Sequence, residues 1–158
     1  MRAMGVVRTL RARVLVVGSI LALAACGAPP PDTLGVRDGV LAPCPAASDC
    51  VHTGLRHPDG TRGLFVRGSI PRGEIVERIR AVVEEMPRAT VVTANRDYLH
   101  VEFRSRVFRL VDDLEISIDP AREAVVRSAA RRSFGSATSN VRRVEELRRR
   151  LDEAAILR

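Results

Sequence analysis

Residues 97–119 constrain the fold most, because two runs of alternating apolar and polar residues follow each other there. The first run covers residues 98–103 and the second covers residues 108–118, with only a short break between them. Alternation with a period of two is typical of a β-strand that buries one face. Strands joined by so short a connection pair antiparallel, so we expect this segment to form the centre of an antiparallel sheet.

The alternation also predicts which side chains face the core, because successive residues of a strand point to opposite faces. The expected inward residues are Phe108, Leu110, Leu114, Ile116 and Ile118. The residues expected on exposed faces are His100, Glu102, Asp113 and Glu115.

Elements on either side complete the expected fold. Apolar residues recur at helical spacing in residues 75–86 and 140–154, and Asn140 is a good N-cap for the second helix. Further short strands are expected at residues 63–70, 90–93 and 123–130. We therefore expect an α+β fold, in which a small antiparallel sheet packs against two helices and is preceded by a loop with a disulfide.

The first 25 residues have the pattern of an export signal. Four arginines precede an uncharged apolar run at residues 14–25, which is too short to span a bilayer. The run leads into the sequence LAAC, which resembles the bacterial lipobox, and its cysteine is Cys26. We predict a lipoprotein signal peptide at residues 1–25 and lipidation of Cys26. The alternatives are an ordinary cleaved signal with an unmodified cysteine and a membrane helix, which the prolines at 29–31 disfavour.

The remaining chain is expected to have two parts. Residues 26–40, rich in Pro and Gly, predict a flexible tether, and residues 41–158 predict a single α+β domain. Two or more acyl chains on Cys26 would hold the protein on the cell membrane, facing the periplasm or the cell exterior.

The charge of the chain argues against one class of partner. The net charge of +7 includes the four arginines of the signal peptide, so the rest of the chain carries only +3. The sequence shows no basic stripe with interleaved aromatic residues, so we expect no nucleic-acid partner.

Cys44 and Cys50 remain once Cys26 is assigned to lipid. An oxidising compartment and an even number of cysteines favour a disulfide between them. A zinc site completed by His52 and His57 is one alternative, although its spacing matches no compact zinc motif. A redox-active pair is another, although the short CxxC spacing is missing. We expect the disulfide, and no metal or other cofactor.

Asp112 is the main candidate for a functional residue. It falls in phase with the inward apolar residues, where an unpaired carboxylate would be costly or would shift its pKa upward. We expect either a structural ion pair with Arg127 or Arg131, or a bulge that turns Asp112 outward. In a functional interpretation, Asp112, Arg127 and His100 form the polar centre of a cleft in a hydrolase-like enzyme. In the alternative interpretation, His100 is a surface residue.

Motifs that define a reaction are missing from the sequence. It contains no GxSxG, P-loop, HExxH or SxxK. The carboxylates at residues 112–115 alternate along a strand, so they cannot share a metal ion. The last helix carries a basic run, which is either a solvated face or a contact for anionic headgroups. Its arginines are Arg142, Arg143, Arg148, Arg149 and Arg150.

Several blocks of residues 41–151 occur in the same order in a known bacterial family. The blocks are LAPCP at 41–45, DCV at 49–51, YLHVEFRS at 98–105, FRLVDDLE at 108–115, RSA at 127–129, Arg131, Asn140 and RVE at 143–145. On these residues the chain resembles the family called domain of unknown function 1499. The family has Asp, Gly and Arg where this chain has Ser136, Thr138 and Val141, so a site in that loop would be altered here. The resemblance implies a common scaffold of the paired cysteines, the Asp112 strand and Arg127, and it implies no reaction.

The sequence has a targeting signal but lacks motifs that define a reaction, and this combination favours a non-enzymatic envelope lipoprotein. We expect its domain to bind a ligand or another envelope protein near the membrane. The alternatives are the hydrolase-like enzyme described above and a structural lipoprotein that contacts anionic lipid or cell-wall polymer through its terminal arginines.

Overall fold

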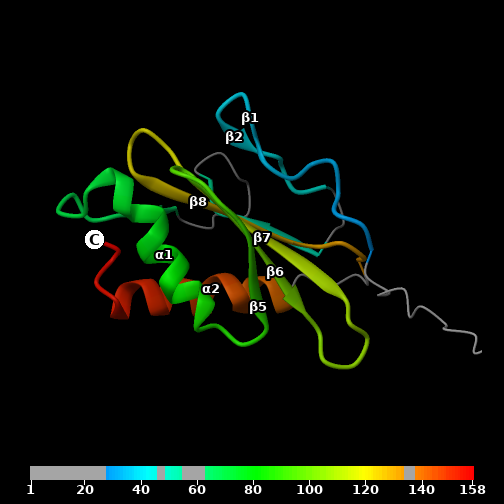
Figure 1. The fold of residues 1–158 in the computed structure, drawn as a ribbon. Helices are drawn as coiled ribbons and strands as arrows, with labels where there is room; N and C mark the ends of the chain where they lie inside the picture. Colours follow the sequence, from blue (N-terminus) through cyan, green and yellow to red (C-terminus); the bar gives the residue numbers. More distant parts are fainter. Residues whose placement is uncertain (1–27, 46–48, 55–62, 134–137) are drawn as a thin grey trace, which may run out of the picture.

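A six-stranded antiparallel sheet forms the centre of the computed structural model, which describes residues 28–45, 49–54, 63–133 and 138–158. Five strands follow the order β3-β8-β7-β6-β5, and β4 also pairs with β8, while β1 and β2 form a separate two-stranded sheet (Figure 1). The strands are β1 (Val36–Arg37), β2 (Val40–Leu41), β3 (Cys50–His52), β4 (Leu64–Phe65), β5 (Ala89–Ala94), β6 (Tyr98–Arg104), β7 (Val111–Ile118) and β8 (Glu123–Ala130). The helices are a 3₁₀ turn (Arg72–Glu74), α1 (Ile75–Glu84) and α2 (Thr138–Glu153).

This fold is mostly β, so the expected α+β class is wrong. The main sheet is larger than expected, a second sheet accompanies it, and the described residues contain only two short α-helices. Strands β1 to β4 are two or three residues long. Such short strands show no alternation, and the chain around them is rich in Pro and Gly, so the sequence underestimates the extent of the sheet.

The two alternating runs of the central segment form β6 and β7. These strands pair antiparallel from Tyr98↔Ser117 to Arg104↔Val111. However, β7 begins only at Val111, and Phe108, which we expected to face inward, is 76% exposed. The reason is that residues 105–110 form the connection between the two strands, so the alternation before Val111 has no sheet to support it.

Both α-helices cover the same face of the main sheet (Figure 1). Helix α1 contacts β5 and β6, whereas α2 contacts β3 and β8, and the two helices contact each other. Their apolar stripes meet alternate residues of the strands, which buries one continuous core. Its fully buried members include Ile75, Ile79, Val83, Leu99, Val101, Leu114, Ile116, Val126, Leu147 and Leu151.

Residues 28–41, here called the N-terminal strap, lie across the opposite face of the sheet (Figure 1). The backbone N–H of Gly35 donates to Glu115 Oε1 at 2.7 Å, and Arg131 donates to the carbonyl of Ala28 at 3.0 Å. Leu41 is only 4% exposed. Of the flexible tether expected at residues 26–40, the described residues 28–40 are held against the sheet, because the sheet offers polar groups that bind the strap.

The predicted signal peptide, residues 1–25, and Cys26 lie outside the described residues, so their role stays a prediction. Among the helices that the structure describes, none is long and apolar enough to cross a membrane.

Candidate functional site

A cleft of about 580 Å³ opens at the end of the sheet where β6 leads into β7. The end of β6, the start of β7, the end of β8 and the first turns of α2 meet there, together with the turn between α1 and β5. Its lining residues are Asp49, Met86, Pro87, Arg88, Phe103, Arg104, Ser105, Leu110, Asp112, Ala130, Arg132, Ser139, Arg142, Arg143 and Glu146.

Asp112 and Arg143 form an ion pair in this cleft. Arg143 Nη2 donates to Asp112 Oδ2 at 2.6 Å, and its guanidinium lies 4.6 Å from the ring centroid of Phe103. Arg143 also donates to Ser128 Oγ at 3.0 Å and to the side-chain oxygen of Asn140. Because these contacts occupy its donors, Arg143 fixes α2 to the sheet.

The partner that we expected for Asp112 is therefore wrong. Asp112 lies on the helix side of the sheet, in phase with Leu114, opposite Phe103 of β6. Arg127 is in register with Glu115, which points to the other face of β7, and it pairs with that carboxylate at 2.8 Å. Arg127 and Arg131 lie on the face of the sheet opposite to Asp112, so neither side chain can reach its carboxylate.

Three arginines at the cleft carry charge that nothing described neutralises. Arg88, Arg132 and Arg142 are exposed and make no side-chain hydrogen bond or ion pair within the part of the chain that the structure describes. The two other arginines of the cleft are paired, Arg104 with Glu102 at 2.5 Å and Arg143 with Asp112. Here these three unpaired residues are called the arginine rim.

The acidic residues of the cleft are already engaged. Asp112 accepts from Arg143, and Glu146 accepts from Arg149 and Arg150, which lie outside the cleft. Asp49 is buried and has a partner of its own. The arginine rim therefore leaves the cleft with a positive electrostatic potential.

The opposite face of the sheet carries a buried layer of charged and polar groups. Arg131 pairs with Asp113 at 2.7 Å and with Glu102 at 2.5 Å, and His100 Nε2 lies 2.8 Å from Asp113 Oδ1. Nearby, the hydroxyl of Tyr98 donates to Glu115 Oε1 at 2.9 Å. This polar layer consists of Tyr98, His100, Glu102, Asp113, Glu115, Arg127 and Arg131, and the N-terminal strap covers it.

The surroundings shift the pKa values of several groups in the polar layer, among them Asp113 and Tyr98. Burial opposes the ionisation of Asp113, but hydrogen bonds from Arg131 and His100 outweigh it and hold the pKa of this carboxyl below its ordinary value. Burial, reinforced by the negative charge of Glu115, raises the pKa of the Tyr98 phenol. At neutral pH Asp113 is therefore ionised and Tyr98 is protonated, as their hydrogen bonds require.

The structure does not bring the residues of the hydrolase-like interpretation together. Asp112 lines the cleft, whereas His100 and Arg127 belong to the polar layer on the other face. His100 is 5% exposed, so it is not the surface residue that the alternation predicted. Glu102, Asp113 and Glu115 are also buried, because the strap covers a face that we expected to meet solvent.

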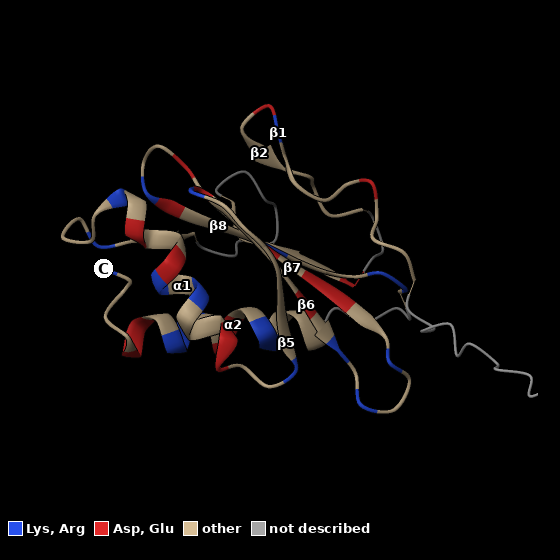
Figure 2. Cartoon of the chain, viewed as in Figure 1, with Lys and Arg blue, Asp and Glu red and all other residues tan. Residues whose placement is uncertain are grey.

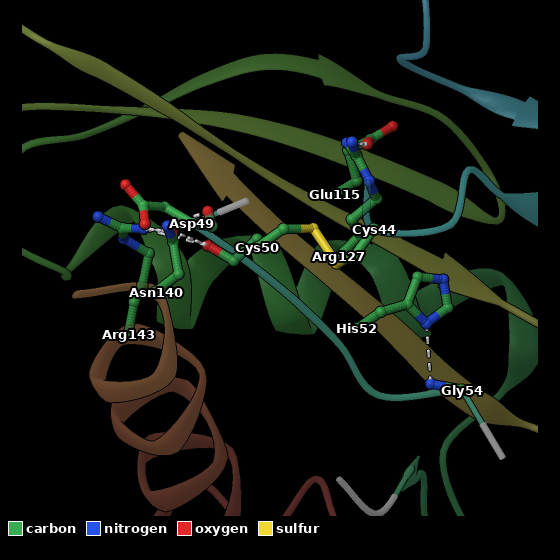
Figure 3. The surroundings of a disulfide bond; sticks show 10 residues. Cys44, Asp49, Cys50, His52, Gly54, Glu115, Arg127, Asn140 and Arg143 are labelled. Atoms are coloured by element: carbon green, nitrogen blue, oxygen red, sulfur yellow. Dashed lines mark hydrogen bonds and ion pairs between the residues drawn. A yellow bond between two sulfur atoms is a disulfide. The ribbon is translucent and has the colours of Figure 1, made fainter. Parts of the chain in front are cut away.

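Cys44 and Cys50 form the expected disulfide, with their Cα atoms 5.6 Å apart (Figure 3). Both sulfur atoms are thereby withdrawn from any zinc site. His52 is buried and accepts a hydrogen bond at Nδ1 from the backbone of Gly54, and His57 lies outside the described residues. Within the ranges that the structure covers, no group of three or more potential metal-ligating side chains is found.

The disulfide loop is also joined to α2. Asn140 Nδ2 donates to the carbonyl of Asp49 at 2.8 Å (Figure 3). Ser128 Oγ donates to Asn140 Oδ1 at 2.7 Å. Asn140 is fully buried in the first turn of α2, which begins at Thr138, so it is not the N-cap that we expected. Its side chain instead connects three elements of the fold.

Most of the terminal basic run is neutralised on the surface of α2. Arg149 pairs with Glu146 and Glu153, and Arg150 pairs with Glu146. Arg142 alone belongs both to this run and to the arginine rim. Sequence reasoning missed Arg88 and Arg132, because they reach the cleft from separate turns and no local pattern marks their convergence.

Of the positions where the chain departs from the resembling family, Ser136 lies outside the described residues. Thr138 begins α2, and Val141 is 45% exposed on that helix.

Comparison with known proteins identifies one family. The family model described as "Protein of unknown function (DUF1499)" matches residues 40–151, which is more than half of the chain. A comparison with curated proteins finds no match.

Proposed function

The chain belongs to the DUF1499 family, and we propose that it is an envelope lipoprotein, anchored through Cys26, whose domain binds an anionic ligand in the arginine-rimmed cleft. The observation that carries this proposal is the arginine rim itself. Arg88, Arg132 and Arg142 surround one cleft without ion-pair partners in the described residues.

Guanidinium groups favour a phosphate or carboxylate ligand. Each presents two N–H donors in a planar fork that matches the oxygens of these anions. Three such groups line one cleft, so an anion bound there would be attracted by more than one positive charge. The ligand is therefore expected to carry at least one full negative charge.

The size and the lining of the cleft narrow the range of possible ligands further. A volume of about 580 Å³ falls within the range of small-molecule sites. Phe103, Met86 and Leu110 contribute apolar surface beside the charged rim. A molecule that joins an anionic group to an apolar or aromatic body can contact both the arginine rim and the apolar lining, whereas an inorganic anion can contact only the arginine rim.

Anchoring at Cys26 is supported by the order of charged, apolar and small residues before that cysteine. It accounts for export and for membrane attachment without a spanning helix, since acyl chains supply the affinity.

Calorimetric titration of the full chain with phenyl phosphate and with inorganic phosphate tests the cleft. We expect phenyl phosphate to bind more tightly, and the double variant Arg132→Gln/Arg142→Gln to lose at least about tenfold in affinity. Arg96→Gln is the matched control, because Arg96 is exposed in the β5–β6 turn, at the other end of β6. Equal binding by the wild type and the double variant would refute the proposal.

A further inference from the structure

The connection between β6 and β7 carries two strongly exposed apolar side chains at its tip. Val107 is 79% exposed and Phe108 is 76% exposed, more than any other large apolar residue in the described part of the chain. Single apolar residues scattered over a surface are ordinary, but two adjacent ones at the tip of a hairpin form a small exposed apolar patch. Here residues 106–109 are called the hairpin tip.

The hairpin holds this tip away from the core. Ser105 and Leu110 close it, because Ser105 N–H donates to the carbonyl of Leu110 at 2.9 Å and Leu110 N–H donates to Ser105 Oγ at 2.9 Å. The four residues between them project beyond the end of the sheet (Figure 1). Val107 and Phe108 therefore stay exposed because the backbone directs them outward, and not because the core lacks room.

Arginine residues flank this small apolar patch. Arg106 and Arg109 flank Val107 and Phe108, and both are exposed without an ion pair in the described residues (Figure 2). Arg104 and Arg132 lie at the base of the same hairpin, at the cleft. An apolar tip with a ring of arginines matches a bilayer interface, where acyl chains receive the apolar groups and anionic headgroups receive the guanidinium groups.

The start of the strap lies at the same end of the domain. Arg131 donates to the carbonyl of Ala28 at 3.0 Å, and its backbone N–H donates to the carbonyl of Val111 at 3.0 Å. Val111 in turn pairs with Arg104, the last residue before the hairpin connection. Ala28 is thus fixed beside the root of the hairpin.

This position limits how far the domain can lie from its anchor. Only one residue separates Ala28 from Cys26, so the chain between them spans at most about 7 Å. Acyl chains on Cys26 would therefore hold this end of the sheet at the headgroups.

From these observations we propose that the hairpin tip inserts Val107 and Phe108 into the interface of an anionic bilayer, so that the arginine-rimmed cleft faces the membrane. The inference rests on the proposed anchoring at Cys26 and goes beyond ligand binding, because it assigns a second membrane contact and an orientation. A bilayer fits better than a protein partner, because the apolar area is small and the two charged residues of the hairpin tip, Arg106 and Arg109, are both cationic.

The absence of Trp from the sequence gives a direct test. The Phe108→Trp variant of the full chain is reconstituted in phosphatidylglycerol vesicles that contain doxyl-labelled lipid. We expect a blue-shifted emission that the doxyl groups quench and that aqueous iodide does not. The matched control is Val40→Trp, because Val40 is 64% exposed on the β1–β2 hairpin, away from the tip (Figure 1). Its emission is expected to stay quenched by iodide.

Three results would overturn the inference. They are an unshifted, iodide-quenched Phe108→Trp emission in vesicles that retain the protein, equal lipid quenching of both variants, and no difference between phosphatidylglycerol and phosphatidylcholine vesicles. Mass spectrometry of the peptide that contains Cys26 tests the anchor separately, and the phenyl phosphate titration tests the cleft. Failure of the membrane contact is thereby distinguished from failure of the proposed function.

Discussion

Arg131 holds both carboxylate oxygens of Asp113, with Nε donating to Oδ2 at 2.8 Å and Nη2 donating to Oδ1 at 2.7 Å. Their side chains are 4% and 1% exposed, so this two-pronged pair lies out of solvent beneath the N-terminal strap. The same guanidinium binds Glu102 and the carbonyl of Ala28. It therefore joins β6, β7, β8 and the strap, and it is the central contact of the polar layer.

Removing this guanidinium should leave two buried carboxylates without their main partner. We expect Arg131→Gln to lower the free energy of unfolding by about 3–5 kcal/mol, as is typical when one member of a buried ion pair is lost. The neighbouring exchange Arg132→Gln is the control, and should change stability by no more than about 0.5 kcal/mol, because Arg132 is exposed. Urea denaturation measures both. Similar losses in the two variants would contradict the assignment of Arg131 to the interior.

The depressed pKa of Asp113 should make the domain sensitive to acid. Above its ordinary pKa of 3.8, Asp113 is ionised in both states, and its native ion pair contributes fully to stability. As the pH falls below 3.8, the unfolded chain takes up the proton first, so the unfolded state binds more protons and this contribution is lost. Stability should therefore decrease with falling pH in that range.

The matching variant isolates this effect. Asp113→Asn should reduce the dependence of the unfolding free energy on pH by up to about 1.4 kcal/mol per pH unit below 3.8. Asp152→Asn is the matched control, because Asp152 is an exposed residue of α2. Urea denaturation at a series of acid pH values measures the slopes. An unaltered slope in Asp113→Asn would show that the carboxyl titrates normally.

The disulfide should stabilise the edge of the sheet. Cys44 and Cys50 are six positions apart, and the loss of chain entropy on closing so short a loop corresponds to about 2.4 kcal/mol. We expect the double variant Cys44→Ala/Cys50→Ala to lose about that amount and to become insensitive to reductant. A wild-type protein whose urea midpoint does not move when reductant is added would contradict this account.

Asn140 should be more important for stability than its exposed neighbour. Asn140→Ala removes the buried acceptor of the Ser128 hydroxyl and a buried donor to the carbonyl of Asp49, so we expect a loss of about 1–3 kcal/mol. Ser139→Ala changes an exposed position of the same helix turn and should be nearly neutral. Thermal unfolding followed by circular dichroism compares them. Equal midpoints for the two variants would mean that the Asn140 network carries little energy.

The sequence predicted the long strands and helices but not the fold class. The alternation in residues 98–103 predicted β6, the strand expected at residues 123–130 is β8, and α1 is amphipathic. Strands β1 to β4 are too short to produce a periodic signal, although β4 falls within the strand expected at residues 63–70. Strand β8, with which β3 and β4 pair, lies far away from them in the sequence. Their formation depends on tertiary contacts that no local pattern contains.

The polar layer shows why burial was misjudged. Alternation in β6 and β7 correctly separates two faces, but it cannot tell whether a polar face meets solvent or a second layer of chain. Glu115 is fully buried because the strap donates Gly35 N–H to it and Arg127 neutralises it. The alternation correctly placed Asp112 on the face that the helices cover. Its partner is Arg143 of α2 and not a residue at β8, because α2 packs on that face.

The most direct test of the central claim follows the arginine side chains themselves. Nuclear magnetic resonance of the full chain resolves their Nε–H groups during a titration with phenyl phosphate. If the cleft binds anions, the signals of Arg88, Arg132 and Arg142 should shift and saturate with one dissociation constant, while that of Arg96 stays unchanged. Equal small shifts of all exposed arginines, or no shift at the arginine rim, would contradict the assignment of this cleft as the binding site.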